Sequence, residues 1–372
     1  MNDRHVVFRA DSSIDIGTGH VMRCLTLAEQ LRQQGARCLF VSREHAGNLL
    51  SLVHERGFEA ARLPVQDVAE IEVRSDEGQP EHARWLGASW QIDARETLAA
   101  IAGLTVDWLV VDHYALDHRW ESELKTACHK LMVIDDLVDR RHDCDFFLNQ
   151  NLGRRDADHS ALVPKGTKVL LGPDYALLRP EFSELRESAV RRRDTAPMRQ
   201  ILVSMGGIDK GNATAQVLAT LRSAEMPADC QVTIVMGKDA PWLEEIHGMA
   251  TSMPFPTVVI SGVANMARLM AESDLAIGAA GGTALERCCM GLPSIIIVMA
   301  ENQRHGAREM ARTDLALVIE SAGDISEELP HAIATMVDDA YRMQMSLRCR
   351  RVTDGNGCER VVAAMSRFNG SY

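Results

Sequence analysis

Short apolar segments alternate with amphipathic helical segments along most of the chain, and this alternation restricts the fold more than any other feature. In the first half, segments typical of strands lie at 5–8, 37–42, 58–63, 108–112 and 131–134. Strands that alternate with helices form a parallel sheet with helices on both faces. The first half is therefore predicted to be a doubly wound α/β domain.

A second series of the same kind follows. Its predicted strands lie at 200–205, 231–236, 257–260, 275–278 and 294–298, and the residues after 320 are predicted to be helical. A length of 372 residues also favours two domains over a single core. We predict an α/β chain of two Rossmann-like doubly wound domains, 1–196 and 197–372, with the last helices as candidates to pack back on the first domain.

The linker between the two domains is expected near Ala196, after a charged helix at 180–193. This helix ends in Arg191, Arg192 and Arg193, a cluster that could contact nucleic acid or could be a solvated helix end. The formal net charge of −12 disfavours a phosphate-backbone partner, so the solvated helix end is preferred.

The remaining composition indicates a soluble cytoplasmic protein without a nucleic-acid or membrane partner. Nine cysteines, an odd number that includes the adjacent pair Cys288 and Cys289, do not resemble a disulfide framework. No apolar run reaches the roughly 18 residues that a spanning helix needs, and the amino terminus lacks a signal-peptide pattern. The sequence does not indicate an oligomeric state.

The turn after the first predicted strand carries the first group of candidate site residues. Gly17 and Gly19 precede His20, which opens a long amphipathic helix that also holds Arg23, and Asp11 lies just before the turn. Open α/β sheets bind ligands at such strand-to-helix turns. Histidine is the side chain whose unperturbed pKa allows proton transfer near neutral pH, so His20 is the candidate catalytic base, although a structural histidine is the alternative. The turn lacks the third glycine of the dinucleotide fingerprint, which disfavours a nicotinamide cofactor.

A second group follows two neighbouring strands of the first half. Asp112, His113 and Tyr114 follow one strand, and Asp135 and Asp136 follow the next. In a doubly wound sheet these strand ends line one crevice together with the opening turn. Each aspartate could instead cap a helix, and for Asp136 this interpretation is preferred. The spacing shows no zinc pattern, so no metal is expected.

A third group lies in the second half, at two glycine-containing turns. Gly206 and Gly207 form one turn, and Gly281 and Gly282 precede Thr283 in the other. Both turns could present backbone N–H groups to a diphosphate at a helix terminus. Glu286, one turn into the second helix, could accept hydrogen bonds from a ribose diol or could be an exposed helix former. No P-loop lysine is present, which argues against an NTPase.

The segment 67–91 interrupts the alternation. It is acidic and contains glycine, proline, Trp85 and Trp90. We interpret it as a surface insertion rather than a lid.

Taken in order, these motifs resemble the family of UDP-2,4-diacetamido-2,4,6-trideoxy-β-L-altropyranose hydrolases of pseudaminic acid biosynthesis. The resemblance covers nearly the whole chain. Its motifs are 8–13, 17–23, 111–114, 134–136, 148–151, 172–179, 204–209, 281–286 and 301–303. Segment 67–91 departs from the pattern, because shorter members lack it.

The resemblance implies a two-domain glycosyltransferase-B type fold, similar to the murein glycosyltransferase, with the domains facing across a cleft. It implies that the carboxyl-terminal half holds UDP and that water replaces UDP at C1 with inversion, without a metal or cofactor. It places the catalytic base at His20 and further catalytic residues at Tyr114 and Asn302, with Gln303 among the substrate-binding residues. A single base suffices for inversion, because the attacking water and the leaving group lie on opposite faces of the sugar.

Three other functions remain open at this level. A UDP-sugar glycosyltransferase of the same fold would use a hydroxyl acceptor in place of water. A non-catalytic nucleotide-sugar binding protein would not need His20. A non-hydrolysing epimerase would need further acid–base residues, which cannot be assigned. The stereochemistry of the sugar is not fixed by the sequence.

Overall fold

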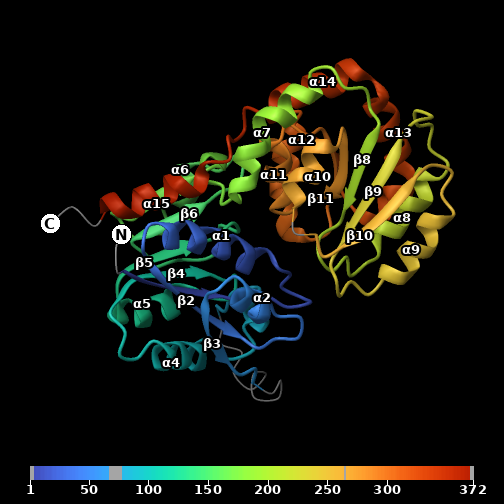
Figure 1. Ribbon diagram of the computed structural model, residues 1–372. Coiled ribbons are helices and arrows are strands. Elements are labelled where there is room, and N and C mark those ends of the chain that lie inside the picture. Colours follow the sequence, from blue (N-terminus) through green and yellow to red (C-terminus); the bar gives the residue numbers. More distant parts are fainter. Residues whose placement is uncertain (1–3, 67–77, 264, 369–372) are drawn as a thin grey trace. The chain divides into compact units, whose positions relative to one another are not determined.

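The computed structural model describes residues 4–66, 78–263 and 265–368 (Figure 1). The chain forms two compact units. Unit 1 extends to Leu177 and resumes at Cys358, and unit 2 is Leu178–Gly357. The chain thus leaves unit 1 before the charged helix at 180–193, whereas the sequence places the boundary after it, at 196.

Unit 1 contains a sheet of seven parallel strands in the order β3-β2-β1-β4-β5-β6-β7. The strands are β1 His5–Ala10, β2 Arg37–Arg43, β3 Glu59–Leu63, β4 Val106–Asp112, β5 Cys128–Ile134, β6 Phe146–Asn149 and β7 Lys168–Leu171. The order reverses between β1 and β4, and such a reversal opens a crevice at the carboxyl ends of the two strands. The first five strands match the predicted ones, and β6 and β7 were not predicted.

The helices of unit 1 cover both faces of this sheet. They are α1 Gly19–Gln33, α2 Leu50–Glu55, α4 Trp90–Ala100, α5 His118–Leu124, α6 Asp156–His159 and α15 Gly357–Phe368, with single 3-10 turns η2 Ala83–Leu86, η3 Lys125–Ala127 and η4 Pro173–Tyr175. The helix α2 begins at Leu50, shortly after Gly47. Gly47, with φ +77°, adopts a left-handed conformation that a helix cannot include.

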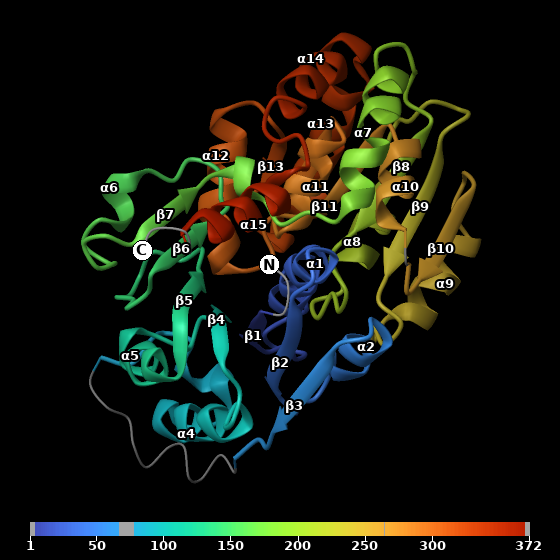
Figure 2. The same ribbon diagram turned by 60° about the vertical axis from the view of Figure 1, so that its left-hand side comes forward.

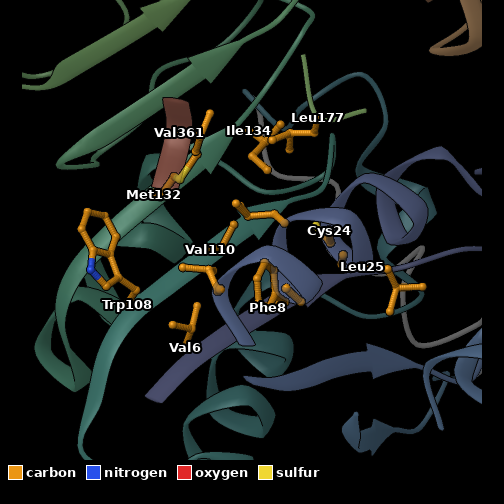
Figure 3. Packing of buried hydrophobic residues seen from close by; sticks show 14 of the residues in the cluster. Val6, Phe8, Cys24, Leu25, Trp108, Val110, Met132, Ile134, Leu177 and Val361 are labelled. Carbon is orange, nitrogen blue, oxygen red and sulfur yellow. The ribbon is translucent and has the colours of Figure 1, made fainter. Parts of the chain in front are cut away.

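The core of unit 1 consists of two apolar layers, one on each side of the sheet. Alternate residues of β1 divide between them: Val6 and Phe8 pack with α1 and α15, and Val7 packs with α4 and α5. Figure 3 shows the first layer, in which Val361 of α15 lies beside Met132 of β5. This alternation follows from the two-residue period of a strand.

Unit 2 repeats the architecture with six parallel strands in the order β10-β9-β8-β11-β12-β13 (Figure 2). Its strands are β8 Gln200–Ser204, β9 Gln231–Met236, β10 Thr257–Ser261, β11 Leu275–Ala279, β12 Ser294–Ile297 and β13 Leu317–Ile319. Its helices are α7 Pro180–Arg193, α8 Ala213–Leu221, α9 Leu243–Thr251, α10 Met266–Glu272, α11 Thr283–Cys289, α12 Arg304–Arg312, α13 Ile325–Val337 and α14 Asp339–Cys349, with 3-10 turns η5 Glu301–Gln303 and η6 Ala322–Asp324. Its strand order reverses between β8 and β11. None of the described helices is long and apolar enough to cross a membrane.

The carboxyl-terminal end of α7 was predicted to be solvated, but only part of it is. Arg191 is 76% exposed, as expected, but Arg193 is only 7% exposed. The guanidinium of Arg193 donates to the carbonyls of Ser273, Ala189 and Met290. The prediction is wrong for Arg193 because the helix face that carries it packs against α10 and α11.

Candidate functional site

His20 and Asp112 form the centre of the candidate site in unit 1. Asp112 ends β4 and lies opposite Ala10 in the β1–β4 register, so it lies at the reversal of the strand order. His20 follows β1 on the first turn of α1. Its Nδ1 atom is 2.6 Å from Asp112 Oδ1. The structure thus brings together two residues that are 92 positions apart in the sequence.

The ionisation state of Asp112 determines which ring nitrogen of His20 carries a proton. Burial opposes ionisation of Asp112, but Arg23 and then His20 outweigh it and hold the pKa of this carboxyl well below its usual range. An ionised carboxylate only accepts hydrogen bonds, so Nδ1 of His20 carries the proton. In the neutral imidazole Nε2 then has a free lone pair, and no hydrogen bond joins it to another described residue. This is the arrangement that a general base requires.

Arg23 holds Asp112 in a bidentate ion pair. Its Nε and Nη2 atoms lie 2.6 and 2.7 Å from the two oxygens of Asp112, and its Nη1 atom lies 2.6 Å from Asp136 Oδ2. Arg23 was predicted to bind substrate, but its guanidinium donates to the carboxylates of Asp112 and Asp136. Asp136 was expected to cap a helix, and this is wrong, because no helix follows it and its Oδ2 accepts from Arg23 and Tyr114.

Tyr114 packs against the ring of His20. The two ring centroids are 4.5 Å apart and the planes meet at 85°. The Tyr114 hydroxyl donates to Asp136 Oδ2 at 3.0 Å. Burial, followed by the charge of Asp136, raises the pKa of Tyr114 well above 10, so the hydroxyl keeps its proton.

Asp11 lies behind the opening turn and is fully buried. Its carboxylate accepts from Arg9 at 2.6 and 2.9 Å, and from the backbone N–H of Arg43 at 2.7 Å. Nε2 of His113 lies 3.2 Å from its Oδ2. Asp11 was predicted to bind substrate. In this position its hydrogen bonds to Arg9 and to the backbone of Arg43 connect the end of β1 to the end of β2.

The opening turn is closed by its own backbone. Gly17, with φ +81°, donates to the carbonyl of Ser13 at 2.9 Å, and a side chain would be strained at this φ. Gly19 is exposed, and no side chain caps the amino terminus of α1. Backbone N–H groups near His20 are thus open to a ligand.

In unit 2 the two glycine turns follow the adjacent strands β8 and β11, at the reversal of the strand order. The turn at Gly206 and Gly207 does not present a free helix terminus. Asp209 accepts from the N–H groups of Ala213 and Thr214 at 2.9 Å each, so the first turn of α8 is capped by its own chain. A diphosphate at this turn would have to use the glycine backbone itself.

The turn at Gly281 and Gly282 is different. No side chain caps α11, and a Cβ added to Gly282 would meet open space. Arg287, which the sequence analysis missed, lies beneath the turn and donates to Thr283 Oγ1 at 3.3 Å and to the carbonyl of Ala279 at 2.8 Å. Burial lowers its pKa to about 10, so it stays charged at neutral pH.

The other predicted residues of unit 2 differ in their environments. The side chain of Glu286 is 16% exposed and lies 3.7 Å from Arg179, and burial raises its pKa, so it is not an exposed helix former. Asn302 is exposed on η5. Gln303 accepts through its side-chain oxygen from the N–H of Met299 at 3.0 Å. Across the described ranges of the chain, no three His, Cys, Asp or Glu side chains gather as a metal site would require.

The chain is similar to several known proteins. Residues 204–355 match the glycosyltransferase family 28 C-terminal domain. The spore coat polysaccharide biosynthesis protein SpsG of Bacillus subtilis is 26% identical over 97% of both chains. UDP-2,4-diacetamido-2,4,6-trideoxy-β-L-altropyranose hydrolase of Campylobacter jejuni is 26% identical over 82% of this chain and 96% of its own. The uncharacterized protein MJ1062 of Methanocaldococcus jannaschii is 23% identical over 79% of this chain, which spans about half (55%) of that protein's length.

Solved structures match the whole chain. The crystal structure of MurG from Acinetobacter baumannii aligns with a TM-score of 0.70 at 17% identity, over 98% of this chain and 99% of that one. LpCGTa, crystallised in complex with UDP, aligns with a TM-score of 0.64 at 13% identity, over 98% and 99%. The chain has a glycosyltransferase-B fold. The predicted fold class, two Rossmann-like doubly wound domains, is thereby confirmed.

Proposed function

We propose that this protein hydrolyses UDP-2,4-diacetamido-2,4,6-trideoxy-β-L-altropyranose to UDP and the free sugar, by inverting attack of water at C1. The observation that carries the proposal is the His20–Asp112 pair, which leaves Nε2 of His20 without a hydrogen-bond partner among the described residues, at the carboxyl end of the strands. The 26% identical Campylobacter jejuni hydrolase supports this substrate.

In this proposal Nε2 of His20 removes a proton from water as the oxygen attacks C1. Asp112 stabilises the imidazolium that forms, and Arg23 fixes the carboxylate in place. The ring of Tyr114 restricts the rotation of the imidazole. The backbone of the turn from Gly17 to the exposed Gly19 is proposed to contact the sugar.

Unit 2 is proposed to bind the UDP. The uncapped turn formed by Gly281, Gly282 and Thr283 provides N–H and hydroxyl donors for the diphosphate, with the charge of Arg287 beneath it. Such donors stabilise the leaving diphosphate without a general acid. Glu286 is proposed to accept from the ribose hydroxyls.

Four further residues of unit 2 complete the proposal. The backbone of Gly206 and Gly207 and the amide of Gln303 are assigned to substrate binding. The exposed amide of Asn302 is assigned to the reacting end of the substrate.

The test is NMR spectroscopy of the full-length protein with the UDP-linked diacetamido sugar and no acceptor. We expect UDP release and a free sugar whose first-formed anomer is inverted. The variant His20→Ala should lose on the order of 10²–10⁴-fold in kcat. His129→Ala, which removes a 68% exposed histidine, is the matched control and should behave as wild type. Near-wild-type turnover by His20→Ala would contradict the assignment of the base.

A UDP-sugar glycosyltransferase is the second candidate. The match of residues 204–355 to a glycosyltransferase domain and the MurG-like fold favour it. In a transferase the same histidine would activate an acceptor hydroxyl. UDP release that requires an added acceptor would support the transferase and exclude the hydrolase.

A further inference from the structure

The described part of segment 67–91 places two aromatic rings next to the candidate site. His82 and Trp85, at and within η2, stack with their centroids 4.3 Å apart and their planes at 16°. Both side chains are half-buried. This near-parallel pair is referred to below as the aromatic stack.

The aromatic stack continues to the proposed base through Tyr114. The centroid of the Tyr114 ring lies 5.7 Å from that of His82 and 6.2 Å from that of Trp85. Tyr114 in turn contacts His20 at 4.5 Å. Four rings of unit 1 therefore form one continuous series of ring contacts that ends at the imidazole of His20.

The segment that carries the aromatic stack is fixed to unit 1 on both sides. Leu86 is 1% exposed and belongs to the core, and the carbonyl of Gly87 accepts from the N–H of Gln66 at 2.8 Å. A Cβ on Gly87 would lie 2.6 Å from His45, so the segment approaches β2 closely. On the other side, Arg119 donates to the carbonyl of Gly78 at 3.3 Å. The rings are held in place, although the sequence around them resembles a loop.

We propose that the aromatic stack of His82 and Trp85 is a carbohydrate-binding face, which contacts the C–H groups and the methyl or acetamido substituents of the sugar whose C1 is attacked. The inference rests on the proposed function and assigns the choice of sugar to segment 78–91. Ligand sites are lined mostly by aromatic and apolar groups, and a flat ring buries much ligand surface at a small cost in side-chain entropy. Burial lowers the pKa of His82 below 6.5, so its ring is neutral at neutral pH and suits an apolar contact.

The test compares steady-state hydrolysis of the UDP-linked diacetamido sugar by wild type, Trp85→Ala, Trp85→Phe and the control Trp90→Phe. Trp90 is a half-buried tryptophan of the same segment, whose ring contacts Arg119 rather than Tyr114. We expect Trp85→Ala to raise KM about tenfold with little change in kcat, because the lost contact stabilises the bound substrate and the transition state equally. Trp85→Phe should retain most of the affinity, and Trp90→Phe should match wild type.

Calorimetry of binding in the His20→Ala background separates this inference from the proposed function. The UDP-sugar should bind more tightly than UDP alone, and Trp85→Ala should abolish this difference without weakening UDP. A KM and a UDP-sugar affinity that do not depend on Trp85 would overturn the inference and leave the hydrolase intact. An equal loss of affinity for UDP would also overturn it, because the effect would then be structural. If the wild-type protein, with His20 intact, releases no UDP while binding still depends on Trp85, the carbohydrate face is upheld and the hydrolysis is refuted.

Discussion

At the scale of single residues, the proposed chemistry depends on the charge of Asp112. The variant Asp112→Asn keeps the shape of the side chain but removes the anion that fixes the His20 tautomer and pairs with Arg23. We expect kcat to fall on the order of 10²–10⁴-fold, with the affinity for UDP unchanged. Single-turnover kinetics and calorimetry measure the two quantities. A kcat within a few-fold of wild type would show that Asp112 has no part in the reaction.

The sequence identifies His20 as a candidate base, but it does not identify the partner of His20. Gly17, Gly19 and the preceding strand are local features, and a turn of this kind predicts a ligand site. The pairing with Asp112 depends on β1 and β4 being neighbours, which is a property of the strand order. For the same reason the sequence assigned Asp136 to a helix cap, and did not predict that Arg23 would bridge the two aspartates.

His142 should make the stability of unit 1 depend on pH. Its Nδ1 atom is 2.7 Å from the buried Glu121, and its Nε2 atom is 3.8 Å from Asp135. Burial opposes the charge, but Glu121 and Asp135 outweigh it and raise the pKa of His142 to about 9. The charged form is favoured by folding, so its contribution is complete below the unfolded pKa of about 6.5 and is lost as the pH rises through 9.

Urea unfolding at pH 6.5 and pH 9.5 measures this dependence. The contribution of His142 should reach on the order of 3 kcal/mol at the lower pH. The variant His142→Phe should reduce the difference between the two pH values, and His129→Ala, at an exposed histidine, should leave it unchanged. If the stability of His142→Phe depended on pH as that of the wild type does, His142 would not be charged in the folded protein.

At the scale of elements, Arg193 joins α7 to the other helices of unit 2. The guanidinium donates to carbonyls at the ends of α10 and α11, so its loss leaves buried acceptors without donors. We expect Arg193→Ala to lower the free energy of unfolding by roughly 2–4 kcal/mol. Arg191→Ala, two positions away and exposed, should change it by less than about 0.5 kcal/mol. Equal effects of the two variants would contradict the structural role of Arg193.

The strands that the sequence analysis missed are among the shortest, although β12, which was predicted from its run of isoleucines, also has four residues. β6 and β7 contain four residues each, and β13 contains three. A run of this length has too few residues to show a strand period, and it forms a strand only because an adjacent strand already presents free hydrogen-bonding groups. The longer strands, such as β1 and β4, were predicted because burial on both faces makes them apolar along most of their length. Arg193 was misassigned because the packing of α7 on other helices leaves no signal in a charged sequence.

At the scale of the whole chain, unit 1 is completed by a helix that follows unit 2 in the sequence. α15 contributes Val361, Val362 and Met365 to the same apolar layer as Trp108, and each of the four is fully buried. Figure 3 labels Val361 and Trp108 in this layer. Each such side chain stabilises the fold by roughly 1.5–3 kcal/mol, and a domain has only about 5–15 kcal/mol in total. Removal of α15 should therefore unfold unit 1.

A protein that ends at Gly357 tests this expectation. Hydrogen exchange should show that protection is lost in β1, α1 and β4 and is retained in β8 and β11, because unit 2 keeps its own core. If unit 2 binds the nucleotide as proposed, the shortened protein should still bind UDP in calorimetry, although it hydrolyses nothing. The variant Arg367→Ala, at an exposed position of α15, is the control and should keep both units protected. Protection of β1 and β4 in the shortened protein would show that unit 1 does not need α15, and loss of UDP binding with unit 2 still protected would place the nucleotide elsewhere.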